Sequence, residues 1–202
     1  MKKFTTFVLA LVAIVFCSCS GVKRAHQLKV LNWADYINED VKEGFEQWYY
    51  EQTGEKVEIV YETFDINETA LTKIEVGHED YDVFCPSEYI IERMLKKDLV
   101  LPIQKDLIPD SIYYFDNISP YVTHKFQQMA PHADVKVSDY TVGYMWGTTG
   151  FIYNPQFVNR EDLQSWGALL DPKFENRILM KDAFRDVYSV LVLYAFHEQV
   201  ES

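Results

Sequence analysis

The stretch VLNWADYI, from Val30 to Ile37, begins as a buried β-strand and ends on residues that such a strand rarely carries. Its first residues are apolar strand formers, whereas Trp33 and Tyr36 flank the carboxylate of Asp35. In an open parallel sheet, ligands bind beyond the carboxyl ends of the strands. The stretch therefore predicts a strand followed by ligand-facing side chains. The alternative is that Trp33 and Tyr36 only cover the core beneath the first helix.

Strand-like and helix-like segments alternate after this stretch. We expect strands over 28–33, 56–62 and 81–85, and helices over 39–54, 65–77 and 87–97. Gly54 and Gly77 lie where two of the helices should end, and Asp65 with Glu68 has the spacing of an N-terminal cap. The βαβαβα order predicts an α/β fold, with a parallel sheet covered by helices on both faces. If the strands take the common order 2-1-3, the ends of the first and third strands lie side by side.

The pattern restarts in the second half of the chain. Prolines interrupt residues 100–139. Strands are expected over 141–147, 149–154 and 177–181, and helices over 160–170 and 186–199. The predicted organisation is an export signal over 1–19, a linker over 20–27, a first α/β domain over 28–139 and an incomplete second α/β domain over 140–202.

The first residues read as a bacterial export signal. Lys2 and Lys3 precede an apolar run that is too short to span a bilayer comfortably, since spanning takes roughly 20 apolar residues. Cys19 follows the small residue Ser18, which resembles a lipoprotein signal and makes Cys19 the expected lipidation site. The alternative is an ordinary secretory signal. Either reading predicts a periplasmic or extracytoplasmic protein, anchored to a membrane if Cys19 is lipidated.

The net charge indicates the class of partner, and the cysteines and histidines bear on disulfides and metal sites. The formal net charge of -12 argues against a nucleic-acid partner and favours a cationic one. Removal of the signal leaves Cys85, which we expect to be a small buried strand residue, so no intrachain disulfide is predicted. No metal site is expected, because the histidines lack ligand spacing. They are His26, His78, His124, His132 and His197.

Two further stretches follow predicted strands. Ser87 and Tyr89 come after the third strand, and with strand order 2-1-3 they should lie beside Trp33 and Tyr36. Each has a simpler alternative: Ser87 as a helix N-cap and Tyr89 as an ordinary helix residue.

Asp182 and Asp186 follow the later strand over 177–181. Their simpler alternatives are an N-cap for Asp182 and a solvated pair with Arg185 for Asp186.

Aromatic rings interleaved with carboxylates suit a flexible organic cation. Ring faces attract ammonium groups by about 0.5 to 2 kcal/mol each, and carboxylates add charge-assisted hydrogen bonds. Methylenes between the charges gain about 0.8 kcal/mol each when covered. A polyamine offers both kinds of group.

Several ordered motifs resemble one family, the spermidine/putrescine-binding proteins of bacterial polyamine ABC importers. They are VLNWADYI, YETFDINETALTKI, YDVFCPSEYIIERM, GYMWGTTGFIYN, SWGALLDPKFENRILMKD and RDVY, from about Leu28 to about Ala195. The resemblance implies a type II periplasmic binding-protein fold that closes on a polyamine and docks on a membrane permease. It implies a monomer with no catalytic step and no cofactor.

The same resemblance assigns site residues. Trp33 and Tyr36 match the family's NW-x-x-Y motif, and Ser87 and Tyr89 match PS-x-Y. Asp186 matches the acidic residue that follows the arginine of the family's second-domain motif. Before that arginine, the family often has two adjacent acids. Asp182 can supply one of these, one position out of place.

The length of the chain and the absence of catalytic motifs bear on the alternative functions. Family members continue well past residue 202, so the resemblance implies a chain truncated at its C-terminus that binds spermidine more weakly than a full-length relative. The rivals are a non-functional remnant and a binder of another small organic cation. An exported hydrolase is not expected, because no GxSxG, HExxH or phosphate-binding loop is present.

Overall fold

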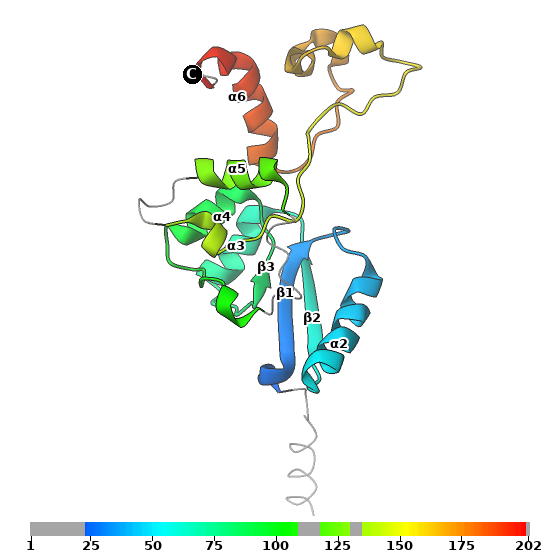
Figure 1. Cartoon of the computed structure of the whole chain (residues 1–202). Helices are drawn as coiled ribbons and strands as arrows, with labels where there is room; N and C mark the ends of the chain where they lie inside the picture. Colours follow the sequence, from blue (N-terminus) through cyan, green and yellow to red (C-terminus); the bar gives the residue numbers. More distant parts are fainter. Residues whose placement is uncertain (1–22, 109–117, 130–134, 201–202) are drawn as a thin grey trace, which may run out of the picture. The chain divides into compact units, whose positions relative to one another are not determined.

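The computed structural model describes residues 23–108, 118–129 and 135–200 of the chain. They divide into two compact units. The first unit takes residues 23–108, 124–129 and 135–141, and the second takes 118–123 and 142–200. Figure 1 shows the chain from blue at the N-terminal side to red at the C-terminal side.

The first unit is built on a three-stranded parallel sheet. Its strands are β1 (Gln27–Trp33), β2 (Glu58–Phe64) and β3 (Val83–Phe84), in the order β2-β1-β3. Trp33 pairs with Phe64, and Leu31 pairs with both Glu62 and Phe84. The strands therefore take the common order 2-1-3, and their carboxyl ends share one edge.

Helix α2 (Glu39–Thr53) forms as the sequence indicates, with a signal at each end. Asn38 accepts a hydrogen bond at its side chain from the Asp40 backbone N–H, at 3.0 Å. This bond satisfies one of the helix's unpaired amides. Gly54 ends the helix at φ 74°, a left-handed conformation that favours glycine.

Helices cover both faces of the sheet. Neighbouring residues of a strand point to opposite faces, and Tyr61 and Glu62 are such neighbours on β2. The Lys42 ammonium of α2 lies 4.8 Å from the centre of the Tyr61 ring. The Lys73 ammonium of α3 (Asn67–Glu75) lies 3.1 Å from the Glu62 carboxylate. Helices α2 and α3 therefore pack on opposite faces, as Figure 1 shows, and the prediction is confirmed.

Two small clusters form the core of the first unit. The buried members of one come from β1, β2 and α3, and those of the other come from α3 and α4 (Glu88–Leu95). They are Leu31, Phe64 and Ala70, and Leu71, Ile90 and Met94. Leu31 and Ile90 are fully buried. Burial of each contributes roughly 1.5–3 kcal/mol. Phe84 packs against both clusters and joins them.

Two local predictions in the first unit are wrong. The N-cap of α3 is Ile66, which makes no side-chain capping bond, so Asp65 does not cap the helix. The third strand is only two residues long instead of five, because the structure pairs β3 with β1 alone, at Val83 and Phe84. Its neighbour Cys85 is still tied to the sheet by a 2.9 Å bond from its N–H to the Leu31 carbonyl.

The strands predicted over 141–147, 149–154 and 177–181 are absent from the described part of the second unit. A strand needs a partner for its backbone groups, and these segments pair with no neighbouring strand in residues 118–123 and 142–200. The side chains of Ile152 and Leu179, which the pattern assigned to strands, are fully exposed. The apolar pattern is present, but it lacks the neighbour that makes it a sheet.

Short 3-10 helices replace the helix predicted over 160–170. They are η6 (Arg160–Leu163), η7 (Trp166–Leu170) and, just beyond, η8 (Pro172–Phe174). Ser165 interrupts the run: its backbone is extended, and its hydroxyl accepts a 3.2 Å hydrogen bond from the Gly167 N–H. Serine competes with helix in this way because its side chain bonds nearby backbone groups.

Helix α6 (Phe184–Val200) completes the described part of the second unit and contains one non-helical residue, Phe196. It lies against η7, where Tyr194 approaches Gly167 so closely that a Cβ there would sit 2.6 Å from the Tyr194 hydroxyl oxygen. Ala168 of η7 and Val190 of α6 are the buried apolar residues of this contact region. The remaining helices of the described chain are η1 (Arg24–His26), η2 (Lys105–Leu107), α5 (Pro120–Gln128) and η5 (Val137–Asp139).

Candidate functional site

Aromatic rings gather where β1 ends. The Trp33 ring centre lies 4.5 Å from that of Phe64 on the neighbouring strand and 6.0 Å from that of Tyr36 in the following turn. Trp33 is half-buried against the core, whereas Tyr36 is 44% exposed. The structure therefore brings the two predicted aromatics together. One side of Trp33 packs on the core and the rest remains accessible, which is compatible with either reading.

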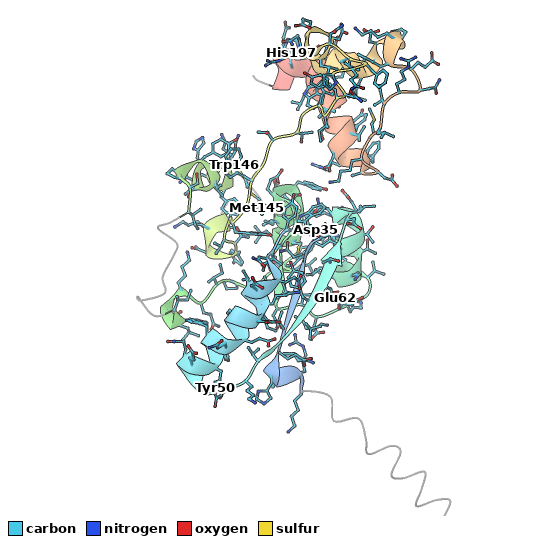
Figure 2. All side chains as sticks on the ribbon, turned by 90° about the vertical axis from the view of Figure 1, so that its right-hand side faces the viewer. Asp35, Tyr50, Glu62, Met145, Trp146 and His197 are labelled. Atoms are coloured by element: carbon cyan, nitrogen blue, oxygen red, sulfur yellow. The ribbon has the colours of Figure 1, made fainter. Side chains whose placement is uncertain are left out.

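The turn after β1 also presents a carboxylate. Asp35 lies between the two aromatics, is exposed, and adopts φ 59°. Left-handed backbone is uncommon for residues other than glycine, although aspartate tolerates it better than most. Figure 2 labels Asp35 at the end of the sheet and Glu62 within β2. The tight turn holds a negative charge close to two ring systems.

A second group of polar side chains joins the ends of β2 and β3. Asn67 opens α3 just after β2, and its amide nitrogen donates to the Ser87 hydroxyl at 2.9 Å and to the Tyr89 hydroxyl at 3.0 Å. The Tyr89 hydroxyl in turn donates to the Glu68 carboxylate at 3.0 Å. Ser87 and Tyr89 are half-buried. The structure thus confirms that these two predicted residues lie together at the end of a strand.

Ser87 occupies the N-cap position of α4 but makes no side-chain capping bond there. Its hydroxyl instead accepts from Asn67. Its N–H donates to the Asn67 side-chain oxygen at 3.1 Å. The simpler reading of Ser87 as only a helix cap is therefore incomplete, since its side chain belongs to the polar group.

This edge of the first unit has the chemistry of a cation site. Aromatic faces attract cations through the ring quadrupole, and hydroxyl and carboxylate oxygens accept hydrogen bonds from ammonium groups. Parallel strands place the two groups on one edge, because β1 lies between β2 and β3. The edge suits a donor-rich, partly apolar cation better than an anion.

The predicted acids of the second unit lie at the start of α6. Asp182 is exposed in a bend two residues before the helix, and it is not the N-cap, because Ala183 accepts the first backbone bond, from Val187. Asp186 lies in the first turn, and its carboxylate is 2.7 Å from the Lys181 ammonium. The solvated pair expected for Asp186 therefore exists, but with Lys181 as its partner.

Two groups behind the sheet edge have shifted pKa values with clear causes. Cys85 is half-buried and lies just beyond β3, so the prediction of a buried strand residue holds only in part. Burial still raises the pKa of its thiol to about 11, so the thiol stays protonated at neutral pH, unlike that of a nucleophilic cysteine. Hydrogen bonds from Tyr81 and then from Lys73 lower the pKa of the Glu62 carboxyl. That network braces β2 against α3 and the residues before β3.

The described residues contain neither a cluster of metal-binding side chains nor a helix that could span a membrane. Within 23–108, 118–129 and 135–200, no cluster of histidine, cysteine and acidic residues is arranged to hold a metal ion. Over the same ranges, none of the helices is both long and apolar enough to cross a bilayer. Cys19, the predicted lipidation site, and His132 lie outside the described residues.

Asn67 and Glu68 belong to the site but were not predicted from the sequence. The strand-end prediction covered the residues after the first and third strands but not those after the second, where DINE follows Phe64. Because the strand order places that end on the same edge, the same strand-end rule points to these residues. A second signal is visible only in the structure: Asn67 is 4% exposed, and a buried amide needs partners.

Comparison with known proteins finds the same family that the sequence motifs resemble. A family model for bacterial extracellular solute-binding proteins matches residues 82–202. A spermidine/putrescine-binding periplasmic protein of Salmonella typhimurium is 28% identical over 94% of this chain and 50% of its own length. The putrescine-binding periplasmic protein SpuD of Pseudomonas aeruginosa is 29% identical over 86% of this chain and 45% of its own length. The predicted resemblance and the extracytoplasmic location are thereby confirmed.

Solved structures agree with the predicted α/β fold. A chain from Listeria monocytogenes assigned to a spermidine/putrescine ABC transporter superposes with a TM-score of 0.64 and 30% identity, over 84% of this chain and 48% of its own. The substrate-binding protein PotD of Streptococcus pneumoniae gives a TM-score of 0.51 and 31% identity, over 74% and 41%. The chain spans about half the length of the curated relatives it matches.

Proposed function

The chain belongs to the bacterial extracellular solute-binding proteins, and on this premise we propose that it captures a polyamine, spermidine or putrescine, for an ABC importer. The relatives named above are polyamine-binding periplasmic proteins, which supports this choice of ligand. The protein would bind the ligand outside the cytoplasmic membrane and deliver it to a permease. It would do so as a monomer, without a catalytic step and without a cofactor.

One observation carries the proposal: the aromatic and polar groups of the first unit share the carboxyl edge of a parallel sheet. Trp33 and Tyr36 offer ring faces, and Ser87 and Tyr89 offer hydroxyl oxygens. An ammonium group has three donors and no acceptor, so it matches this set of oxygens. The methylenes of a polyamine gain about 0.8 kcal/mol each when an aromatic ring covers them.

Asp182 and Asp186 of the second unit are proposed as carboxylate partners for a ligand ammonium group. Asp186 is already held by Lys181, at 2.7 Å, in a pair whose side chains are 53% and 42% exposed. Exposed ion pairs contribute only about 0 to 1 kcal/mol, so a polyamine ammonium can replace the lysine at little cost. Cys19 is proposed as a lipid anchor that keeps the protein near its permease.

A ligand panel read by thermal shift tests the proposal on the full-length gene product. Putrescine, spermidine, choline and a metal chelate are compared with the neutral diol 1,4-butanediol. A bound ligand raises the melting temperature in proportion to ln(1 + [L]/Kd), so polyamines should stabilise the protein at concentrations where the diol does not. Stabilisation by choline alone would favour another organic cation, and no response to any of the compounds would favour a protein that no longer binds.

A further inference from the structure

Asn67 is an unusual residue to find buried at the edge of a sheet. It opens α3 directly after β2 and is 4% exposed. Asparagine is mostly a surface residue, and each of its polar atoms loses its water when it is buried. Its presence here therefore requires partners inside the protein.

Those partners are the two predicted ligand-binding hydroxyls. The Asn67 nitrogen donates to Ser87 at 2.9 Å and to Tyr89 at 3.0 Å, and its oxygen accepts from the Ser87 N–H at 3.1 Å. A side-chain amide has two donor hydrogens and one acceptor oxygen, and all three functions are used. One side chain from the end of β2 thus holds both residues that follow β3.

Glu68, the next residue, fixes the other end of the network. Its exposed carboxylate accepts a hydrogen bond from the Tyr89 hydroxyl, with 3.0 Å between the two oxygens. The Tyr89 oxygen therefore receives a hydrogen bond from Asn67 and directs its own proton to Glu68. A hydroxyl normally rotates to suit its surroundings, but these contacts give the Tyr89 hydroxyl a set orientation.

We propose that Asn67, assisted by Glu68, is the positioning residue of this site and fixes the Ser87 and Tyr89 hydroxyl oxygens as acceptors for a ligand ammonium. The inference rests on the proposed polyamine function and adds the residue that prepares the site before the ligand arrives. Asn67 acts through Ser87 and Tyr89 and does not itself need to touch the ligand. Preorganised acceptors bind more tightly because less order is lost on binding.

The test is a double-mutant cycle on the full-length gene product, with spermidine affinity measured by calorimetry. Asn67→Ala should weaken binding about tenfold, the scale of a hydrogen bond to a charged group. In a Tyr89→Phe background, which already lacks one of the positioned hydroxyls, the same substitution should weaken binding by roughly threefold or less. Glu68→Gln, which keeps an acceptor oxygen, should cost less than Glu68→Ala.

Two further variants separate positioning from loss of fold. Ala70→Gly also destabilises α3, because glycine is a poor helix former, but it leaves the Asn67 hydrogen bonds in place. It should lower the melting temperature and leave Kd within about twofold, a change below the tenfold expected for Asn67→Ala. If Asn67→Ala does not fold, Asn67→Ser replaces it in the cycle: serine keeps a polar atom but is too short to bridge both hydroxyls.

The outcomes are distinct. Wild-type protein that shows no saturable polyamine binding overturns the proposed function, and the inference with it. Wild-type binding with an unchanged Kd in the Asn67 variant overturns the inference alone. A loss that persists in full in the Tyr89→Phe background, or that Ala70→Gly reproduces, also overturns it.

Discussion

Replacing Trp33 by alanine tests the aromatic half of the site. The ring is half-buried and packs 4.5 Å from Phe64 and 6.0 Å from Tyr36, measured between ring centres. Complete loss of a buried tryptophan costs about 3–5 kcal/mol of unfolding free energy. Since only part of this ring is buried, we expect Trp33→Ala to lower stability by about 2 kcal/mol and the protein to remain folded.

The binding effect is a separate quantity. An aromatic face contributes roughly 1 to 2 kcal/mol to holding a desolvated ammonium group, so Kd for spermidine should rise by about 5- to 30-fold. Trp33→Phe keeps a ring face and should lose less than about threefold, below about 0.7 kcal/mol. Calorimetric titration gives Kd for each variant, and urea unfolding gives the stability.

Trp48 provides the matched control. It lies on α2, is 36% exposed, and has its ring centre 5.6 Å from that of Phe45. Trp48→Ala therefore removes a packed, partly exposed tryptophan that follows no strand end, and it should lower stability without changing Kd. A folded Trp33→Ala protein that binds spermidine as tightly as wild type would refute the assignment, and so would an equal loss of binding in Trp48→Ala.

Three further predictions concern charges and the thiol. Lys181→Met releases Asp186 from its ion pair and should tighten spermidine binding by about two- to fivefold in a titration, the scale of an exposed pair; weaker binding would contradict the role of Asp186. The pKa of Asp80 is lowered to about 2, first by its hydrogen bond with Arg24, so the stability from this pair is present above about pH 4 and is lost as pH falls toward 2. Asp80→Asn should flatten that part of the pH–melting curve, and an unchanged curve would contradict the assignment. The pKa of Cys85, about 11, predicts labelling at pH 8 about a hundredfold slower in native than in unfolded protein, followed by the mass of the Cys85 peptide, and equal rates would contradict its burial.

The sequence predicted the first unit well because its signals are local and agree with one another. The period-two pattern and Gly54 at the end of α2 each act within a few residues. The order 2-1-3 is common in such folds, but the local pattern does not select it over other orders. With the observed strand order, the strand ends place Trp33 and Ser87 on one edge of the sheet.

In the described part of the second unit, the sequence pattern predicted strands that the structure does not form. Residues such as Ile152 and Leu179 fit a strand pattern, yet the described residues provide no strand to pair with them. A strand is a property of two segments, so periodicity in one segment is not sufficient. The sequence also did not predict the Lys181–Asp186 ion pair or the hydrogen bonds from Asn67 to Ser87 and Tyr89. Both depend on side-chain contacts that residue spacing alone does not specify.

The most direct measurement is a calorimetric titration of the full-length gene product with spermidine at low and high salt. The account predicts saturable binding of one ligand per chain that weakens as salt increases, because charged groups contribute to the affinity. Replacing spermidine with a neutral diol should abolish the heat of binding. No saturable heat, or equal binding of the diol, would contradict the claim that this edge of the sheet binds a polyamine.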